Sequence, residues 1–139
     1  MNKENILVEV IVNRQVEKVW EFWTNPKHII NWNFASDDWC CPKAHNDLRI
    51  GGEFTYRMSA KDDSFKFDFR GRYTKILPNK LIEYVLEDKR KVSIQFISND
   101  KSTKIIEKFE TESENSNEKQ KEGWQAILNN FKKYVENKK

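Results

Sequence analysis

Two adjacent cysteines and a nearby histidine are the residues in this sequence that most directly suggest site chemistry. Cys40, Cys41 and His45 carry the sulfur and nitrogen atoms that bind zinc. Structural zinc normally has four ligands in spaced pairs, whereas these cysteines are neighbours and His28 is the only other imidazole. Neighbouring cysteines also rarely form a disulfide with each other. A reactive thiolate needs a cation beside it, a role open to Lys43. We favour structural cysteines and expect neither a metal nor a cofactor.

Three aspartates near the cysteines are candidates for acid–base catalysis. General acid–base catalysis needs a carboxylate inside a cavity with a shifted pKa. Asp37 and Asp38 suit a turn, and Asp47 can pair with Arg49 at the surface. The serines and histidines lack the spacing of a nucleophile elbow or triad, and the one pair of adjacent glycines lacks the Lys-Ser/Thr of a phosphate loop. We therefore assign no catalytic residue and favour a binding protein, with the enzyme alternative left open.

Aromatic side chains concentrate in residues 32–58 of an otherwise polar chain. This segment contains Trp32, Phe34, Trp39, Phe54 and Tyr56, whereas the whole chain is 37% hydrophobic and 34% charged. Rings gathered in this way either form a solid core or line a cavity, and the pattern alone leaves both possibilities open. In a cavity, tyrosine hydroxyls and indole N–H groups would supply the few polar contacts that apolar pockets carry.

Length and charge exclude several classes of protein. A chain of 139 residues predicts one domain spanning 1–139. The 25 Lys and Arg are largely interleaved with 22 Asp and Glu, so there is no basic stripe for nucleic acid. No apolar run approaches the roughly 20 residues of a membrane span. The N-terminus lacks the apolar segment of a signal peptide, so we expect a cytoplasmic protein.

The order of secondary structure elements positions the aromatic residues. β-branched residues predict a strand over 6–12, and apolar residues at helical spacing predict a helix over 15–24, which Asn13 can cap. A second short helix is predicted over 26–32, with Asn25 as N-cap and Pro26 in the first helical position. The remaining elements are a packed loop over 33–46, strands over 54–58, 65–70, 73–77, 81–86, 92–97 and 103–111, and a helix over 118–136.

Alternation along the strands predicts which face of the sheet is buried. Phenylalanine occupies every second position of 65–70, which is typical of a sheet with one buried face. The same alternation directs Glu53, Arg57, Asp68 and Arg70 outward. A shift of one residue would reverse this, and Arg57 would then turn inward as an anchor for an anionic group. Short connections between the strands favour an antiparallel meander.

The final helix has an apolar stripe that must be buried. Its members lie at helical spacing and are Trp124, Ile127, Leu128, Phe131 and Val135. The simplest packing lays this helix across the concave side of the sheet, while the two short helices close one end. We expect bulges at Gly51, Gly52 and Gly71 to curve the sheet.

Four segments together resemble a known family. They read VWEFWTNPKHIINW, DLRIGGEFTYRM, FDFRGRYTKILPNKLIEY and GWQAILNNFKKYVE, and they cover nearly the whole chain in order. In this order the chain resembles the START-like (SRPBCC, helix-grip) superfamily. Within that superfamily it is similar to the bacterial family that is like the activator of heat-shock protein ATPase. The resemblance implies an α+β fold, with a curved antiparallel sheet wrapped around a long C-terminal helix and two short helices after the first strand.

The resemblance also implies a deep cavity between the sheet and the C-terminal helix. Carried over by position, the residues lining it and contacting a ligand would be Trp32, Phe34, Trp39, Phe54, Tyr56, Phe67, Phe69, Tyr84, Phe96, Trp124 and Leu128.

Three functions follow from this resemblance. The leading hypothesis is a domain that binds a hydrophobic or aromatic small molecule. The second is a co-chaperone-like or stress-response interaction protein with a chaperone as partner. Eukaryotic co-chaperones of this group carry an additional N-terminal domain, whereas this sequence starts directly at its first predicted strand, which counts against the second hypothesis. The third is a cyclase- or hydratase-type enzyme acting in the cavity. A binding domain predicts an apolar pocket with few ionisable groups. A co-chaperone predicts an exposed apolar patch and a small cavity. An enzyme predicts a buried acid or base that faces the cavity. Monomer and dimer both remain open.

Overall fold

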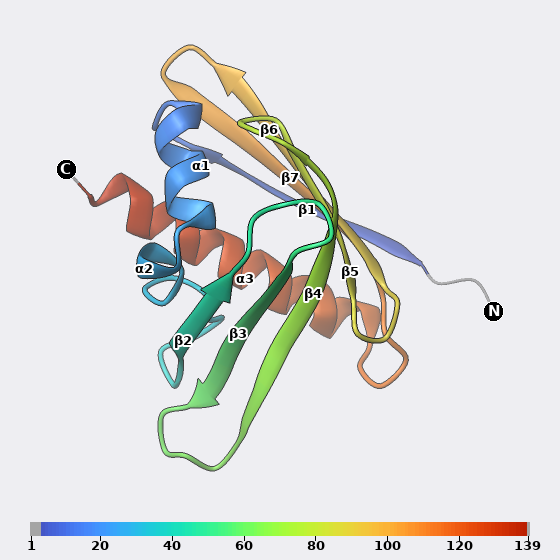
Figure 1. Ribbon diagram of the computed structural model, residues 1–139. Helices are drawn as coiled ribbons and strands as arrows, with labels where there is room; N and C mark the ends of the chain where they lie inside the picture. The colour runs from blue at the N-terminus through green and yellow to red at the C-terminus, as the bar shows by residue number, and fades with distance from the viewer. Residues whose placement is uncertain (1–3, 139) are drawn as a thin grey trace.

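The computed structural model describes residues 4–138, which form one seven-stranded sheet and three helices (Figure 1). Residues 1–3 and 139 of the predicted domain lie outside the described residues. The strands are β1 (Asn5–Val12), β2 (Trp39–Asn46), β3 (Glu53–Ala60), β4 (Lys66–Leu77), β5 (Leu81–Leu86), β6 (Lys91–Asn99) and β7 (Ser102–Glu110). The helices are α1 (Val16–Thr24), α2 (Pro26–Ile29) and α3 (Asn117–Glu136).

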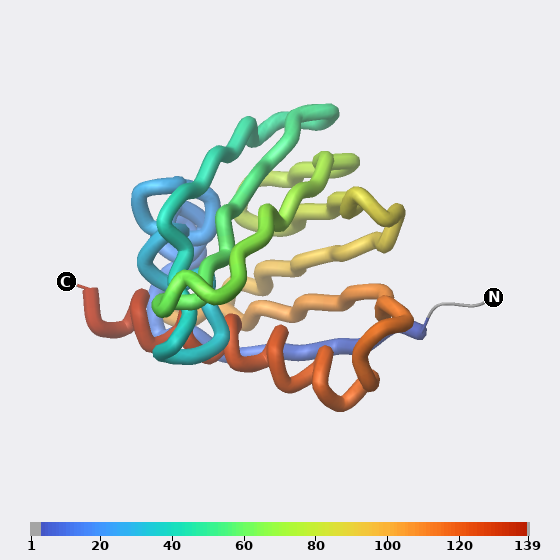
Figure 2. Tube along the Cα trace, turned by 90° about the horizontal axis from the view of Figure 1, so that it is seen from below, coloured from blue at the N-terminus to red at the C-terminus, as the bar shows by residue number. Residues whose placement is uncertain are grey.

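All neighbouring strands run antiparallel, in the order β1-β7-β6-β5-β4-β3-β2. The strands β2 to β7 form the predicted meander, and β1 pairs with the last of them. The sheet curls, and α3 lies along β1 while α1 and α2 close one end (Figure 2). The structure therefore confirms the predicted α+β helix-grip fold.

Four local predictions were wrong. The segment 33–46 is not a loop throughout, because its second part is the edge strand β2. The two strands predicted over 65–70 and 73–77 are one continuous strand, β4. The second helix ends at Ile29 rather than at residue 32, and helix α1 has Gln15 rather than Asn13 in the N-cap position. Asn25 does cap α2, since its side chain accepts a hydrogen bond from the backbone N–H of Lys27.

The glycines shape the sheet differently from the prediction. The register shifts lie between Cys40 and Lys43 and between Tyr73 and Lys75, not at glycines. Gly51 instead occupies a turn with φ of 85°, a conformation that favours glycine. Gly71 leaves room for the ring of Phe54, because a Cβ atom there would lie 2.5 Å from that ring.

The outer face of the sheet carries the charged residues assigned to it. Arg57 and Arg70 both pair with Asp68, and Arg72 pairs with Glu53. Arg57 therefore does not turn inward, and the alternative of a one-residue shift is wrong. Such exposed pairs contribute under about 1 kcal/mol each, so this face contributes little to the stability of the fold.

Helix α3 buries its apolar stripe unevenly. Leu128, Phe131 and Val135 in its C-terminal half are fully buried, and the rings of Trp23 and Trp32 pack edge-on against Phe131. Nearer the N-terminus of the helix, Trp124 and Ile127 are only half-buried. The helix thus packs tightly against the core at one end and leaves space beneath it at the other.

Candidate functional site

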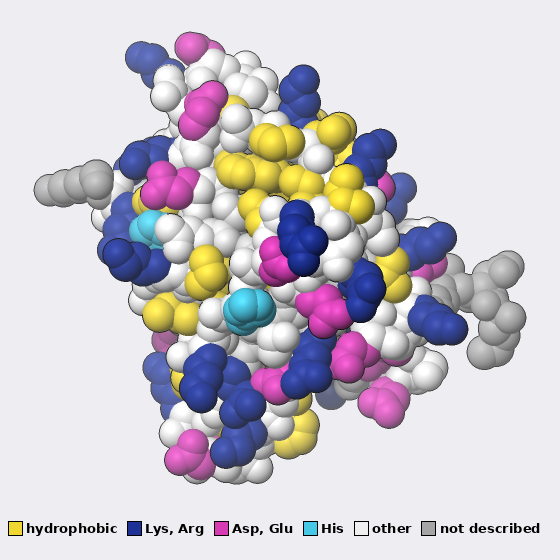
Figure 3. Space-filling view, in the orientation of Figure 1, with side chains coloured by type: hydrophobic (Ala, Val, Ile, Leu, Met, Phe, Trp, Pro, Cys, Tyr) yellow, Lys and Arg dark blue, Asp and Glu magenta, His cyan; other side chains and the backbone are white. Residues whose placement is uncertain are grey.

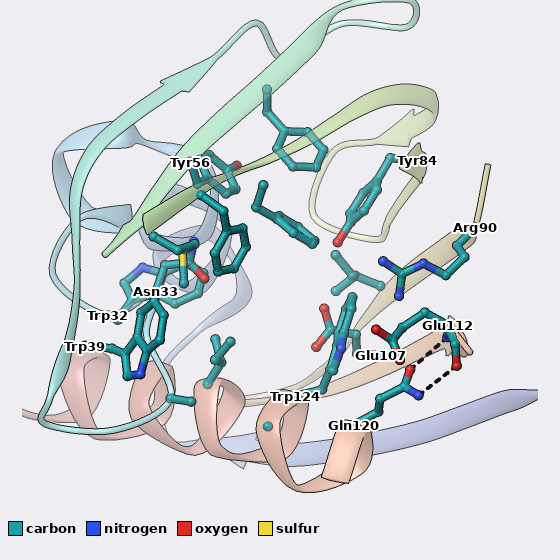
Figure 4. Close-up of a pocket in the computed structure, with 18 of the residues that line it drawn as sticks. Trp32, Asn33, Trp39, Tyr56, Tyr84, Arg90, Glu107, Glu112, Gln120 and Trp124 are labelled. Atoms are coloured by element: carbon teal, nitrogen blue, oxygen red, sulfur yellow. Dashed lines mark hydrogen bonds between the residues drawn. The ribbon is translucent and has the colours of Figure 1, made fainter. Parts of the chain in front are cut away.

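A cavity of about 700 Å³ occupies the space between the concave face of the sheet and the N-terminal half of α3. Its volume lies in the range of roughly 300–1,000 Å³ that is usual for small-molecule sites. Figure 4 shows aromatic rings entering this space from several strands and from the helix. Trp124 contributes from α3, where its indole stacks on Phe109 with ring centroids 4.0 Å apart.

Most of the residues predicted for the lining surround this cavity. They are Trp32, Trp39, Phe54, Tyr56, Phe67, Phe69, Tyr84 and Trp124. The lining also includes Trp23, Asn33, Met58, Tyr73, Ile82 and Ile94, which the prediction omitted.

Three predicted residues lie outside the lining. Leu128 is fully buried in the packed half of α3. Phe96 is buried against Trp20 and Trp23 of α1, with ring centroids 5.3 and 5.8 Å apart. Phe34 lies in the segment after α2, where its carbonyl accepts a hydrogen bond from Asn130. Leu128 and Phe96 have the spacing of inward-facing residues, but their surroundings are filled. Phe34 lies in an irregular segment and is half-buried.

One end of the cavity is rimmed by exposed rings. Trp39 at the start of β2 packs edge-on against Phe65 and Phe67, with ring centroids 6.0 and 6.2 Å apart. Phe67 is 43% exposed although the alternation along β4 predicted a buried face. The inward face of this strand thus continues past the core to the edge of the cavity.

Glu107 on β7 is a buried acid in this apolar cavity. It lines the cavity, its residue is 6% exposed, and its side chain has no hydrogen bond or ion pair within residues 4–138. Burial raises the pKa of its carboxyl to about 8, so the group is largely protonated at neutral pH. Figure 4 labels both Glu107 and Trp124 among the side chains that line the cavity.

A signal for Glu107 was present in the sequence but was not used. Along β7 the buried residues are Thr103, Ile105, Glu107 and Phe109, at every second position. A charged residue in the inward phase of a strand is a candidate functional group.

Polar residues gather at the other end of the cavity. Arg90, which follows β5, pairs with Asp88 through its Nε at 2.7 Å. Its two Nη groups have no hydrogen-bond partner among the described residues, and the guanidinium lines the cavity. Glu112, Asn115 and Lys119 complete this end.

Gln120 holds this polar end in shape. Its side-chain oxygen accepts a hydrogen bond from the backbone N–H of Glu112, and its amide group donates to the carbonyls of Glu112 and Asn115. Figure 4 shows the two bonds to Glu112. Because these bonds use the amide fully, we assign Gln120 a structural role.

The cysteines lie on the edge strand β2, and neither is among the residues that line the cavity. Cys41 is buried and Cys40 half-buried on β2, and neither forms a disulfide. Across residues 4–138, no group of three or more His, Cys, Asp or Glu is placed to hold a metal ion.

Cys41 is expected to resist thiol reagents in the native protein. Burial raises the pKa of its thiol to about 11 from 9.0, which lowers the thiolate population about a hundredfold. A Cys40→Ala variant should therefore label slowly with a chromogenic disulfide reagent until denaturant is added. The matched Cys41→Ala variant reports the half-buried Cys40 alone. Fast labelling of native Cys40→Ala would show that Cys41 is accessible and reactive.

Comparison with known proteins places this geometry in context. A sequence model of the family described as Activator of Hsp90 ATPase homolog 1-like protein matches residues 13–136. The chain is similar to the solution NMR structure of the AHSA1-like protein from Aeromonas hydrophila, with 39% identity, a TM-score of 0.90, and coverage of 96% of this chain and 92% of that chain. A solution structure from Cytophaga hutchinsonii shows 50% identity and a TM-score of 0.83, with the same coverage of both chains.

A more distant crystal structure, of a protein from Chromobacterium violaceum, shares the fold. Its identity is 21% and its TM-score 0.86, over 97% of this chain and 99% of that chain. No curated protein matches the chain. None of the described helices is both long and apolar enough to cross a bilayer.

Proposed function

Because the chain belongs to the family of Activator of Hsp90 ATPase homolog 1-like proteins, we propose that it uses the helix-grip fold to bind an apolar or aromatic small molecule between the sheet and α3. The observation that supports this proposal is the cavity of about 700 Å³ and its ring-rich lining. Flat rings pack favourably against offset or edge-on aromatic side chains. We propose that the ligand contacts Trp32, Trp39, Phe54, Tyr56, Phe67, Phe69, Tyr84 and Trp124.

Gly123 on α3 offers a direct test. It lines the cavity, and a Cβ atom added there would meet nothing within 4 Å. A Gly123→Phe substitution should therefore direct a ring toward the void, because the first atom of its side chain meets no neighbour. Gly123→Ala is the matched control, since it leaves the void almost unchanged and removes a helix-interior glycine that costs roughly 0.5–1 kcal/mol.

We expect saturable changes in tryptophan fluorescence when a panel of flavonoids, aromatic polyketides and fatty acids is titrated. Trp23, Trp32, Trp39 and Trp124 all line the cavity and would report an occupant. At least one compound should bind both the wild type and Gly123→Ala, while binding to Gly123→Phe should fall at least tenfold. The proposal fails if no compound binds, or if binding is unchanged in Gly123→Phe.

A second candidate is a cyclase- or hydratase-type enzyme, and Glu107 favours it. This hypothesis predicts a buried acid or base facing the void, and Glu107 is a buried carboxyl in the cavity lining. Turnover of a panel compound by the wild type, with loss of turnover in Glu107→Gln but not of binding, would distinguish the enzyme from a binding protein.

The co-chaperone alternative depends on the surface instead. Figure 3 shows apolar side chains gathered near the loops that join β2 to β3 and β4 to β5. Large exposed apolar residues of the described chain include Ile50, Leu77 and Ile97. The co-chaperone alternative predicts a small cavity, however, whereas the observed cavity has a volume of about 700 Å³. Stimulation of a chaperone ATPase by both Gly123 variants alike would favour it over ligand binding.

A further inference from the structure

Glu107 and Tyr84 are two buried polar groups that face the same cavity. In the sheet, Glu107 on β7 pairs with Ile94, and Tyr84 on β5 pairs with Val92. Because Ile94 and Val92 are two residues apart on β6, both side chains lie on the concave face, with one strand between them. Figure 4 shows the Tyr84 hydroxyl pointing toward the part of the cavity where Glu107 lies.

Both groups are hydrogen-bond donors at neutral pH. Burial raises the pKa of Tyr84 well above its ordinary value, so its phenol keeps its proton. Burial also raises the pKa of Glu107 to about 8, and a protonated carboxyl has one O–H to donate. Neither side chain has a hydrogen-bond partner within the part of the chain that the structure describes.

The two donors are open to the cavity, because no side-chain nitrogen or oxygen of the described residues is both fully buried and without a hydrogen-bond partner. A ligand that displaces water from them must supply an acceptor, since a donor left unsatisfied costs roughly 1–3 kcal/mol. A cationic ligand is disfavoured because it would need an ionised Glu107 and would approach Arg90 and Lys119 in the same cavity. A neutral acceptor oxygen has neither disadvantage.

Resting on the proposed function, we infer that the ligand carries a ketone-type carbonyl beside its ring system, and that this oxygen accepts hydrogen bonds from Glu107 and Tyr84. A neutral carboxylic acid and a phenol that donate to one oxygen form a known arrangement for holding carbonyl compounds in apolar sites. The cavity thus selects ring ketones over hydrocarbons of the same shape.

The titratable and charged groups that share this cavity with Glu107 come from several elements. They are Tyr56 on β3, Tyr73 on β4, Tyr84 on β5, Arg90 after β5, Glu112 after β7 and Lys119 on α3.

Three naphthalene probes of nearly equal shape test the inference by calorimetric or fluorescence titration. They are methyl naphthyl ketone, ethylnaphthalene and naphthylethylammonium. Below the Glu107 pKa of about 8, the wild type should prefer the ketone to the hydrocarbon by about tenfold, as expected for two hydrogen bonds. This preference should decline as pH rises through that pKa, because the carboxylate no longer donates.

Variants separate the two donors. Tyr84→Phe should lose part of the preference, and Glu107→Leu most of it. Glu107→Gln keeps an N–H donor and should retain a preference that no longer falls near pH 8. Equal binding of ketone and hydrocarbon by the wild type, or tighter binding of the ammonium probe, would overturn the inference while the binding function stands. Failure of all three probes to bind would overturn both.

Discussion

Replacing Phe131 by alanine is expected to lower the free energy of unfolding by about 3–5 kcal/mol, a typical cost for removing a large ring from a packed core. Phe131 is fully buried, and its ring lies edge-on to Trp23 and Trp32 at centroid distances of 4.9 and 4.8 Å. It joins α3 to both short-helix segments at the packed end of the fold. Urea denaturation of the two proteins, followed by circular dichroism, gives the difference directly.

An exposed phenylalanine serves as the control. Phe65 is 58% exposed, so Phe65→Ala should change the free energy of unfolding by no more than about 0.5 kcal/mol. If Phe131→Ala lowers the free energy of unfolding by less than about 1 kcal/mol, α3 does not pack against the sheet and the short helices as described.

The sequence predicted those elements whose side chains follow a regular period. Strand β5, with the pattern LIEYVL, was predicted with its observed ends because apolar residues occupy its buried positions. Strand β2 reads WCCPKAHN, which has no alternation and includes Pro42. Proline is tolerated there because β2 is an edge strand with only one neighbour. Its strand conformation comes from pairing with β3, a long-range effect that local pattern does not show.

The same reasoning explains the limits of the predicted site. Periodicity shows which face of an element is inward, but not whether atoms of another element fill the space opposite. Leu128 and Trp124 lie on one stripe of α3, yet only Trp124 reaches the cavity. The difference depends on α1 and α2, which fill one end of the fold, and on the sheet curvature at the other end. Glu107 had a local signal, because its flanking inward residues are apolar, whereas Arg90 in a turn had none.

The stability of the wild type relative to Glu107→Gln is expected to fall as pH rises from about 4.5 to about 8. The carboxyl has an ordinary pKa of 4.5 and a folded pKa of about 8. Between these values the folded protein keeps a proton that the unfolded chain has released. Folding therefore takes up a proton, and higher pH favours the unfolded state. Each pKa unit corresponds to about 1.4 kcal/mol, so the total difference approaches roughly 3–5 kcal/mol above pH 8.

Urea titrations of both proteins across this pH range measure the effect as a difference between two curves. Groups with lowered pKa values, such as Asp68 and Glu136, act oppositely and lose their stabilising contribution at low pH, but they are common to both proteins and cancel. Glu122→Gln on the exposed side of α3 is the matched control and should give curves parallel to the wild type. If the Glu107→Gln and wild-type curves also run parallel, the carboxyl of Glu107 is solvated or paired in solution. It would then not be the protonated donor that gives the cavity its preference for a carbonyl.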